Sequence, residues 1–346
     1  MYKILRSLLF RLDPEAAHQL TLNALRLAGG FAPARWMLGS MYQAPSKPVQ
    51  AFGLTFKNPV GLAAGYDKDA LAIKGLSALG FGHVEVGTVT PRPQAGNPKP
   101  RVFRLLEDAA VINRMGFPGK GAEYVSNQLS VISNWRSVAS DQHSVIIGVN
   151  LGKNKDTPLE EAAQDYIELM HRFIFPADYL TINISSPNTV GLRRLQGREM
   201  LEQLLGAIQK EREAISLGRG GHAPILVKIS PDLSDEELDD AIGVILDKGM
   251  DGVIATNTTL ARAGLRSRHQ GESGGLSGSP LAAGSEAVLS RVVRRVNGKV
   301  PIISVGGIMS PDDAKKRLAL GASLVQVYTG LIYRGPKLVQ QIVKSL

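Results

Sequence analysis

A group of amide and hydroxyl side chains follows a short apolar run near the middle of the chain. The run, residues 179–182, predicts a buried strand, and the loop after it carries Asn183, Ser186 and Asn188. Each Asn amide offers both donors and an acceptor, which suits a ring of alternating amides and carbonyls. Taken alone, the segment is better explained as a turn whose side chains bond their own backbone. Its neighbours along the chain favour a binding site.

Polar and glycine residues also follow the other apolar runs that predict strands. The active sites of parallel-stranded barrels lie at the C-terminal ends of the strands, so these residues are expected on one face. After the first run come Ala64, Gly65, Tyr66, Asp67 and Lys68. The later runs are followed by Thr88, Asn150, Thr256, Asn257, Thr258, Gly307, Tyr328 and Thr329. An insertion after the second run ends in Asn113, Arg114, Met115, Gly116 and Phe117.

Two lysines and two glycine-containing loops indicate an anionic ligand. Lys228 lies inside an apolar run, and a buried lysine needs an anionic partner such as a reduced flavin. Lys68 could pair with a substrate carboxylate, although a solvated loop lysine is the more common case. The loops at Gly307 and after Tyr328 follow the last two runs, which is the usual phosphate site of such barrels. Plain turns are the alternative, but two loops at these places favour phosphate.

The general base is expected to be a serine. We find no pattern of metal ligands, and no histidine falls in a predicted catalytic loop. His143 and His222 precede predicted strands, at the other end of a barrel. Ser186 is therefore the best-placed base.

Eight apolar runs alternate with helical stretches and predict an α/β fold, a (β/α)₈ TIM barrel over residues 46–346. The helical stretches include residues 159–173, 199–215, 235–248 and 312–319. Two insertions, 90–113 and 260–280, account for extra length. The strands are predicted at residues 60–62, 83–86, 145–149, 179–182, 225–229, 252–255, 301–305 and 324–327, with a small hairpin at 51–56.

Residues 1–45 form a separate helical segment. Leucines on one helical face alternate with Lys3, Arg6 and Arg11, and Asp13-Pro14 predicts the start of a second helix. A leucine-rich basic segment suits the membrane interface. A helical cap packed on the barrel is an equally good explanation.

Composition narrows the function classes. The chain has 346 residues, 44% hydrophobic and 21% charged, with a net charge of +9 and no cysteine. Disulfides, thiolate metal sites and cysteine nucleophiles are thus excluded. No apolar run is long enough to span a membrane. The charge fits an anionic membrane surface, anionic ligands or nucleic acid, but no nucleic-acid motif is present and we expect no such partner.

Taken together, the motifs resemble those of the class 2, quinone-dependent dihydroorotate dehydrogenases. The resemblance covers essentially the whole chain. It rests on residues 58–65, 113–117, 152–155, 183–189 and 274–278. In class 1 relatives the base is a cysteine at the position of Ser186, which this chain cannot supply. Tyr66 stands where the family more often has Leu or Phe, and Val190 where Pro is common.

The resemblance implies one FMN per chain, dihydroorotate as substrate and a membrane quinone as co-substrate. It implies FMN contacts at Ala64, Gly65, Tyr66, Asp67, Lys68, Thr88, Asn150, Asn183, Lys228, Thr256, Gly278, Gly307, Tyr328 and Thr329. It places the pyrimidine at Lys68, 113–117, Asn183, Asn188, Asn257 and Thr258, with Ser186 as base. It places the quinone at His18, Arg101 and Tyr328.

The same resemblance implies a pathway and a location. The reaction would convert dihydroorotate to orotate in de novo pyrimidine synthesis. The protein would be a monomer, bound peripherally to the cytoplasmic face of the inner membrane through residues 1–45. Two other classes remain open: a different flavin-dependent barrel oxidoreductase, and a non-enzymatic protein that binds membranes or nucleic acid.

Overall fold

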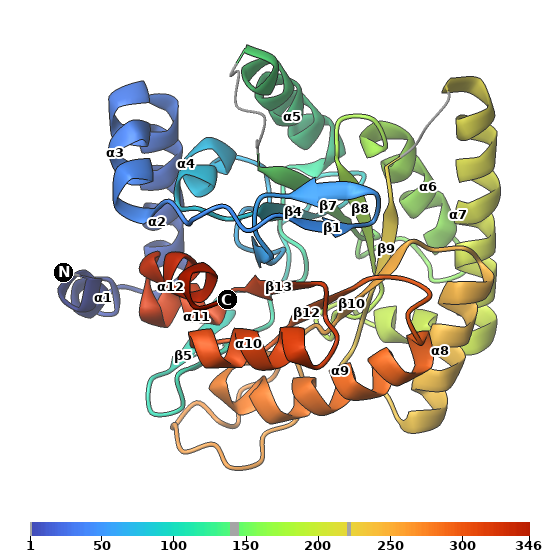
Figure 1. The fold of residues 1–346 in the computed structure, drawn as a ribbon. Helices are drawn as coiled ribbons and strands as arrows, with labels where there is room; N and C mark the ends of the chain where they lie inside the picture. The colour runs from blue at the N-terminus through green and yellow to red at the C-terminus, as the bar shows by residue number, and fades with distance from the viewer. Residues whose placement is uncertain (1, 139–144, 220–222) are drawn as a thin grey trace.

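Eight parallel strands close into a barrel in a computed structural model that describes residues 2–138, 145–219 and 223–346 (Figure 1). Strands adjacent in the barrel are adjacent along the chain, apart from the hairpin and insertion strands between them. The predicted TIM barrel is confirmed, with all eight strands within a few residues of the expected positions. They are β3 (Val60–Leu62), β4 (His83–Val89), β7 (Ile146–Leu151), β8 (Tyr179–Asn183), β9 (Ile225–Ile229), β10 (Gly252–Ala255), β12 (Ile302–Val305) and β13 (Leu324–Val327). His143 and His222 lie outside the described residues.

Helices surround the barrel, and capping residues in the sequence mark where some of them begin. Ser234 caps one helix in a reciprocal capping box with Glu237, and Ser310 caps another. The surrounding helices are α4 (Ile73–Ala78), α5 (Gly121–Val138), α6 (Ala162–Phe173), α7 (Arg198–Arg219), α8 (Asp235–Asp247), α9 (Ala282–Val296), α10 (Pro311–Ala319), α11 (Thr329–Arg334) and α12 (Lys337–Ser345). Short 3₁₀ turns, η1 (Leu192–Gln196) and η2 (Ser279–Leu281), precede α7 and α9.

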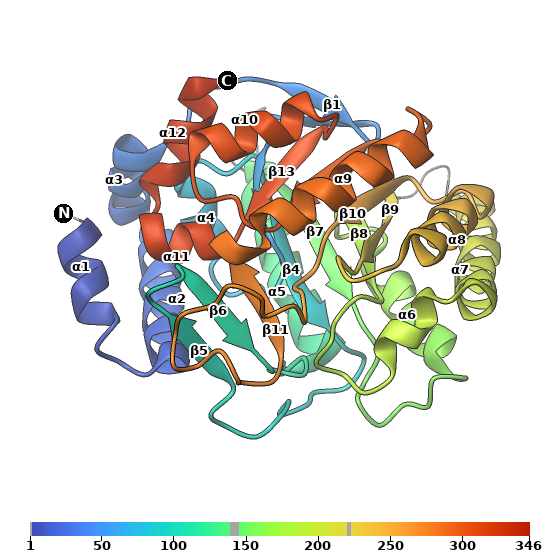
Figure 2. The same ribbon diagram turned by 90° about the horizontal axis from the view of Figure 1, so that it is seen from below.

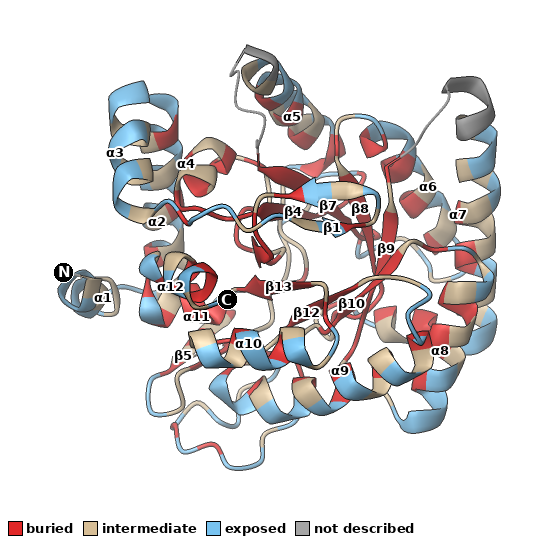
Figure 3. Cartoon of the chain, in the orientation of Figure 1, coloured by how far each residue is buried: buried red, intermediate tan, exposed pale blue. Residues whose placement is uncertain are grey.

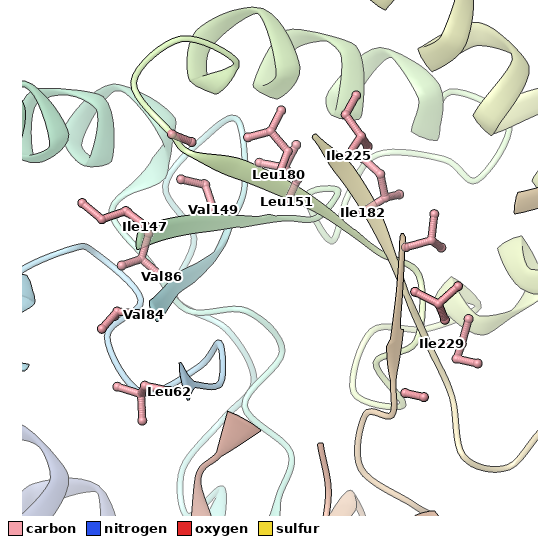
Figure 4. Close-up of a cluster of buried hydrophobic side chains, with 14 of the residues drawn as sticks. Leu62, Val84, Val86, Ile147, Val149, Leu151, Leu180, Ile182, Ile225 and Ile229 are labelled. Atoms are coloured by element: carbon pink, nitrogen blue, oxygen red, sulfur yellow. The ribbon is translucent and has the colours of Figure 1, made fainter. Parts of the chain in front are cut away.

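Most of the core lies between the strands and these helices. Alternate residues of a strand face opposite sides, so Val84 and Val86 of β4 join the outer layer with Leu62 and Ile182 (Figure 4). The strands are buried on both sides, as Figure 3 shows in red. This explains why the barrel strands read as nearly continuous apolar runs.

The remaining positions of the strands face the barrel interior. At the N-terminal end they form an apolar layer with Tyr179, closed by the hairpin of β1 (Val49–Ala51) and β2 (Leu54–Phe56). A Cβ at Gly148 would overlap the Tyr179 ring, so glycine makes room for the ring inside the barrel. Polar residues, including Glu85 and Lys228, occupy positions two residues further along β4 and β9.

The two insertions meet in a three-stranded antiparallel sheet over the C-terminal end of the barrel (Figure 2). Strands β5 (Val102–Leu105) and β6 (Ala110–Asn113) come from the first insertion, and β11 (Gly275–Gly278) from the second. Asn113 pairs with Gly275. The sequence did not predict this sheet, because β11 lies about 160 residues from its partner β6 and each of the three strands is only four residues long.

The N-terminal segment forms three helices beside the barrel: α1 (Tyr2–Leu9), α2 (Pro14–Gly30) and α3 (Ala32–Tyr42). The Asp13 carboxylate accepts hydrogen bonds from the backbone N–H groups of Glu15 and Ala16, which confirms the predicted cap. Gly29 touches Gly75 of α4 so closely that a Cβ there would overlap its backbone. None of the helices in the described ranges combines the length and apolar character needed to cross a membrane.

Candidate active site

A cleft of about 1000 Å³ opens at the C-terminal end of the barrel, beneath the three-stranded sheet. The cleft brings together most residues singled out from the sequence: Ala64, Gly65, Lys68, Thr88, Asn113, Met115, Gly116, Phe117, Asn183, Ser186, Asn188, Lys228, Thr256, Asn257, Thr258, Gly278, Gly307, Tyr328 and Thr329. Six other predicted residues do not line it: His18, Tyr66, Asp67, Arg101, Arg114 and Asn150.

The asparagines at the strand ends form one connected hydrogen-bond network. The Asn183 amide nitrogen donates to Thr88 and to Asn150 Oδ1, each at 3.0 Å. Its Oδ1 accepts from the Ser185 hydroxyl at 3.0 Å and from Asn257 at 3.4 Å. The Asn183 side chain is therefore held at both ends, and the network sets which face it presents to the cleft.

Ser186 is buried beside two more amides. Its hydroxyl oxygen accepts a hydrogen bond from the Asn188 backbone N–H at 3.3 Å, which leaves the hydroxyl proton available to another acceptor. The Asn188 amide donates to Asn113 Oδ1 at 3.1 Å, whereas Asn188 Oδ1 is buried without a partner within the described residues. An unpaired buried acceptor is costly, and an N–H group of a ring in the cleft would satisfy it.

Two lysines line the cleft, Lys68 from the loop after β3 and Lys228 from β9. Burial lowers the pKa of Lys68 to about 8, partly offset by Asp69 and Glu15, and its ammonium donates to the Gly65 carbonyl at 2.7 Å. Burial also lowers the pKa of Lys228, and the carboxylate of Glu85 opposes that shift. Both cations thus lie where an anionic group of a ligand would stabilise them.

The glycine loop after β12 is anchored from behind. The Gly306 carbonyl accepts from the Ser285 hydroxyl at 2.7 Å and from the Arg317 guanidinium at 2.9 Å. Arg317 is fully buried, so the loop has a rigid support. Gly306 and Gly307 have φ of +118° and +75°, a conformation that glycine adopts without strain. The geometry fits the phosphate loop expected from the sequence.

Several predicted residues have contacts outside the cleft. Asp67 accepts hydrogen bonds from the backbone N–H groups of Leu71 and Ala72, and burial raises its pKa to about 6. Arg114 forms an ion pair with Glu272 at 2.6 Å, linking the two insertions. The contacts of Asn150 and Tyr66 place them one layer behind the cleft residues Asn183 and Tyr328.

A row of aromatic rings leads from α2 toward the cleft. His18 meets Tyr66 edge-on with ring centres 5.0 Å apart, and Tyr66 meets Tyr328 at 6.0 Å. Burial lowers the pKa of His18 to about 3, so the imidazole is neutral. Arg101 lies nearby on the first insertion and donates to both carboxylate oxygens of Glu15 on α2, at 2.7 and 3.1 Å. The three residues predicted for the quinone site thus surround the junction of α2 and the barrel.

Two polar residues of the barrel interior were not predicted from the sequence. Glu85 and Gln326 are fully buried, and Gln326 lines the cleft. Glu85 lies within an apolar run, the same signal that identified Lys228, so a systematic search for charges in such runs would have found it.

Comparison with known proteins identifies the family of the chain. The sequence model of the family "Dihydroorotate dehydrogenase" matches residues 47–346. The chain is 48% identical to the dihydroorotate dehydrogenase (quinone) of Burkholderia thailandensis over 100% of this chain and 97% of the relative. It is 46% identical to that of Pseudomonas putida, over 100% and 98%. A crystal structure of the Eimeria tenella enzyme in complex with ferulenol superposes with a TM-score of 0.88 at 41% identity, covering 98% of this chain and 93% of the other.

The family match spans the whole barrel, and the curated relatives match the chain from end to end. The resemblance recognised in the sequence is therefore confirmed. The chain belongs to the dihydroorotate dehydrogenase family.

Proposed function

We propose that the protein is an FMN-dependent dihydroorotate dehydrogenase that oxidises dihydroorotate to orotate and passes the electrons to a quinone. The observation that carries the proposal is the cleft itself. It combines five amide- or hydroxyl-bearing residues, Asn113, Asn183, Ser186, Asn188 and Asn257, with Lys68. Such a set matches a planar ring of amides bearing a carboxylate. The reaction is a step of de novo pyrimidine synthesis.

Two features of the cleft support FMN as the cofactor. The anchored Gly306-Gly307 loop would hold the phosphate, and Lys228 at the floor would stabilise negative charge on the ring system. Bound flavin supplies a hydride acceptor, which no side chain of this chain can replace. Thr88, Asn183, Thr256 and Tyr328 line the space between loop and floor.

The substrate would be oriented by the amides and the lysine. Lys68 would bind its carboxylate, and Asn188 Oδ1, which lacks a partner in the described structure, would accept a ring N–H. Ser186 would take the proton from C5 of dihydroorotate as the hydride leaves C6. A serine is a weak base unless its own proton moves onward, and buried Thr189 with water would provide that route.

The quinone would arrive along α2. His18, Tyr66 and Tyr328 form a row of aromatic rings between this helix and the cleft, and the pair of Arg101 with Glu15 holds helix and insertion together. Dihydroorotate enters from the cleft side, so the two substrates would use different routes.

The N-terminal helices would also dock on a membrane. Among the described residues, ten of the sixteen large apolar side chains that are exposed lie between Ile4 and Met41, including Leu27, Phe31 and Trp36. Lys3 of α1, Arg26 of α2 and Arg11 in the turn between these helices are exposed and cationic. This combination favours an anionic bilayer surface. We place the protein peripherally on the cytoplasmic face of the inner membrane, as a monomer.

One experiment tests the proposal and both alternative classes. Purified protein should be yellow, with about one FMN per chain, and should bleach when dihydroorotate is added without oxygen. Adding a quinone should restore the colour. Colourless protein would contradict the flavin assignment, and yellow protein that does not bleach would indicate another substrate.

A further inference from the structure

Glu85 is a buried carboxylate that the proposed reaction does not use. It lies on β4 inside the barrel, with no exposed surface. Moving a charge out of water is unfavourable unless neighbouring groups compensate it. The groups around Glu85 are therefore informative about its role.

Three side chains from three strands donate hydrogen bonds to Glu85. Asn150 Nδ2 on β7 reaches Oε1 at 2.8 Å, and Gln326 Nε2 on β13 reaches Oε2 at 2.8 Å. The Tyr179 hydroxyl on β8 reaches Oε2 at 3.1 Å. Amide nitrogens only donate, so the surroundings are complementary to an ionised carboxylate.

The carboxylate determines which way the Asn150 amide faces. Since its nitrogen points to Glu85, its oxygen faces the opposite direction and accepts from Thr88 at 2.6 Å and from Asn183 at 3.0 Å. Asn183 is then turned so that its own oxygen accepts from Ser185. Glu85 thus sets the orientation of the Asn150 amide, and Asn150 in turn sets that of Asn183, which lines the cleft.

Gln326 is turned by the same carboxylate. Its amide nitrogen donates to Glu85, and its amide oxygen is buried without a hydrogen-bond partner in the described part of the chain. Gln326 has no exposed surface and lines the cleft. An unsatisfied buried acceptor of this kind is costly until a ligand donates to it.

Lys228 completes this layer of charge. It lies on β9 at the cleft floor, and Glu85 is the anion that opposes the effect of burial on its pKa. Replacing Glu85 with a neutral side chain would leave that cation without its compensating charge.

We propose that Glu85 is a positioning residue that sets the direction of the amides at the cleft floor, holding Asn183 in one orientation and leaving the Gln326 carbonyl to accept an N–H of the bound flavin ring. The inference rests on the proposed function. It goes beyond it by assigning roles to Glu85 and Gln326, neither of which was among the residues expected from the sequence.

The test is a double-mutant cycle between Glu85 and Asn150. In Glu85→Gln, a new N–H₂ group must face either Asn150 or Gln326, and that amide has to turn. FMN retention should fall, and the orotate Kd, measured from the change in flavin absorbance, should rise about tenfold or more. Asn150→Asp places two carboxylates together and should be at least as damaging.

The combined variant, Glu85→Gln with Asn150→Asp, should recover. The new amide can donate to the new carboxylate, which still accepts from Thr88 and Asn183, and the net charge of the layer is restored. An orotate Kd within about threefold of wild type, with FMN retained, is the expected result, since paired residues couple non-additively. Side chains that only fill volume would not show this rescue.

Tyr179→Phe is the matched control. It removes one donor to Glu85 but keeps the charge and both amides, so the orotate Kd should stay within about threefold of wild type. Wild-type affinity in Glu85→Gln, or a double variant as weak as the single variants, would overturn the inference. If the single variants do not fold, recovery of FMN content and Tm in the double variant supports it, and failure to recover overturns it. Wild type that binds neither FMN nor orotate would instead refute the proposed function.

Discussion

Polar groups are usually exposed and apolar groups buried, and the cleft and the N-terminal helices depart from this rule in opposite ways. The cleft floor buries charged and polar groups such as Glu85, Lys228 and Gln326, whereas the N-terminal segment exposes Leu27 of α2, Trp36 of α3 and Phe31 between these helices. Soluble proteins avoid both situations unless a ligand or partner compensates them. The difference matches the two tasks of the proposed function, in which the cleft would bind a polar heterocycle and the helices would meet an apolar phase.

The two regions are joined mainly where α2 and α3 pack on α4. Gly29 packs on Gly75, and Arg101 pairs with Glu15 across the junction. The aromatic row of His18, Tyr66 and Tyr328 crosses the same junction. If the tasks are divided as proposed, changes in one region should affect one half-reaction and leave the other intact.

Removing residues 1–45 should have the largest effect. Turnover with a long-chain quinone in detergent should fall to background, because His18 and the apolar route along α2 are lost. Flavin reduction by dihydroorotate should persist, since the cleft residues lie beyond this segment. FMN content is the control for folding, because Leu22 is part of the core. Normal quinone turnover would show that these helices are only a cap.

Ser186→Ala should impair the opposite half-reaction. Loss of a positioned general base slows the reaction about 10²–10⁴-fold. Stopped-flow flavin reduction by dihydroorotate should therefore slow by that factor, while reoxidation of chemically reduced enzyme by quinone stays unchanged. Reduction within a few-fold of wild type would mean that Ser186 is not the base.

Polar substitutions on the exposed helical surface should separate membrane binding from chemistry. Phe31→Ser with Trp36→Ser removes two large exposed apolar groups. Burial of one such side chain is worth about 1.5–3 kcal/mol, so affinity for anionic phospholipid vesicles should fall by about tenfold or more. The matched control is Val190→Ser with Leu260→Ser, two exposed residues of the barrel. Equal losses in both variants would contradict docking through the helices.

Lys68→Met should weaken binding of the pyrimidine without loss of flavin. Hydrogen bonds to charged groups contribute about 1.5–3 kcal/mol, which corresponds to a rise in orotate Kd of about 10–150-fold. The Kd is measured by flavin absorbance, and quinone reoxidation of reduced enzyme serves as the control. Unchanged affinity would refute the pairing with the carboxylate.

The affinity for orotate should depend on pH through the protonation of Lys68. Burial lowers the pKa of Lys68 to about 8, so the ammonium is charged below that pH and loses its proton above it. Orotate Kd should therefore be flat from pH 6.5 to 7.5 and rise toward about tenfold per unit above pH 8. Lys68→Arg keeps its charge and should flatten the rise. An identical rise in both proteins would assign it to another group.

Local patterns in the sequence determined the elements of this fold. Apolar runs placed all eight strands, and Asp13 with Pro14 placed the start of α2, because burial of a strand and capping of a helix depend on residues a few positions apart. The polar ends of the strands predicted the face of the cleft, since parallel strands bring their C-terminal ends together. The boundary between residues 45 and 46 stays a prediction.

Tertiary structure alone decided which distant groups meet. Residues about 65 to 240 positions apart meet in the pairing of β6 with β11, in the ion pair of Arg101 with Glu15, and in the hydrogen bonds from Asn150, Tyr179 and Gln326 to Glu85. Closure of the barrel brings Glu85 and Lys228, on strands separated by two others, into one layer. Such contacts depend on the register and curvature of the closed sheet, which no local pattern of residues encodes.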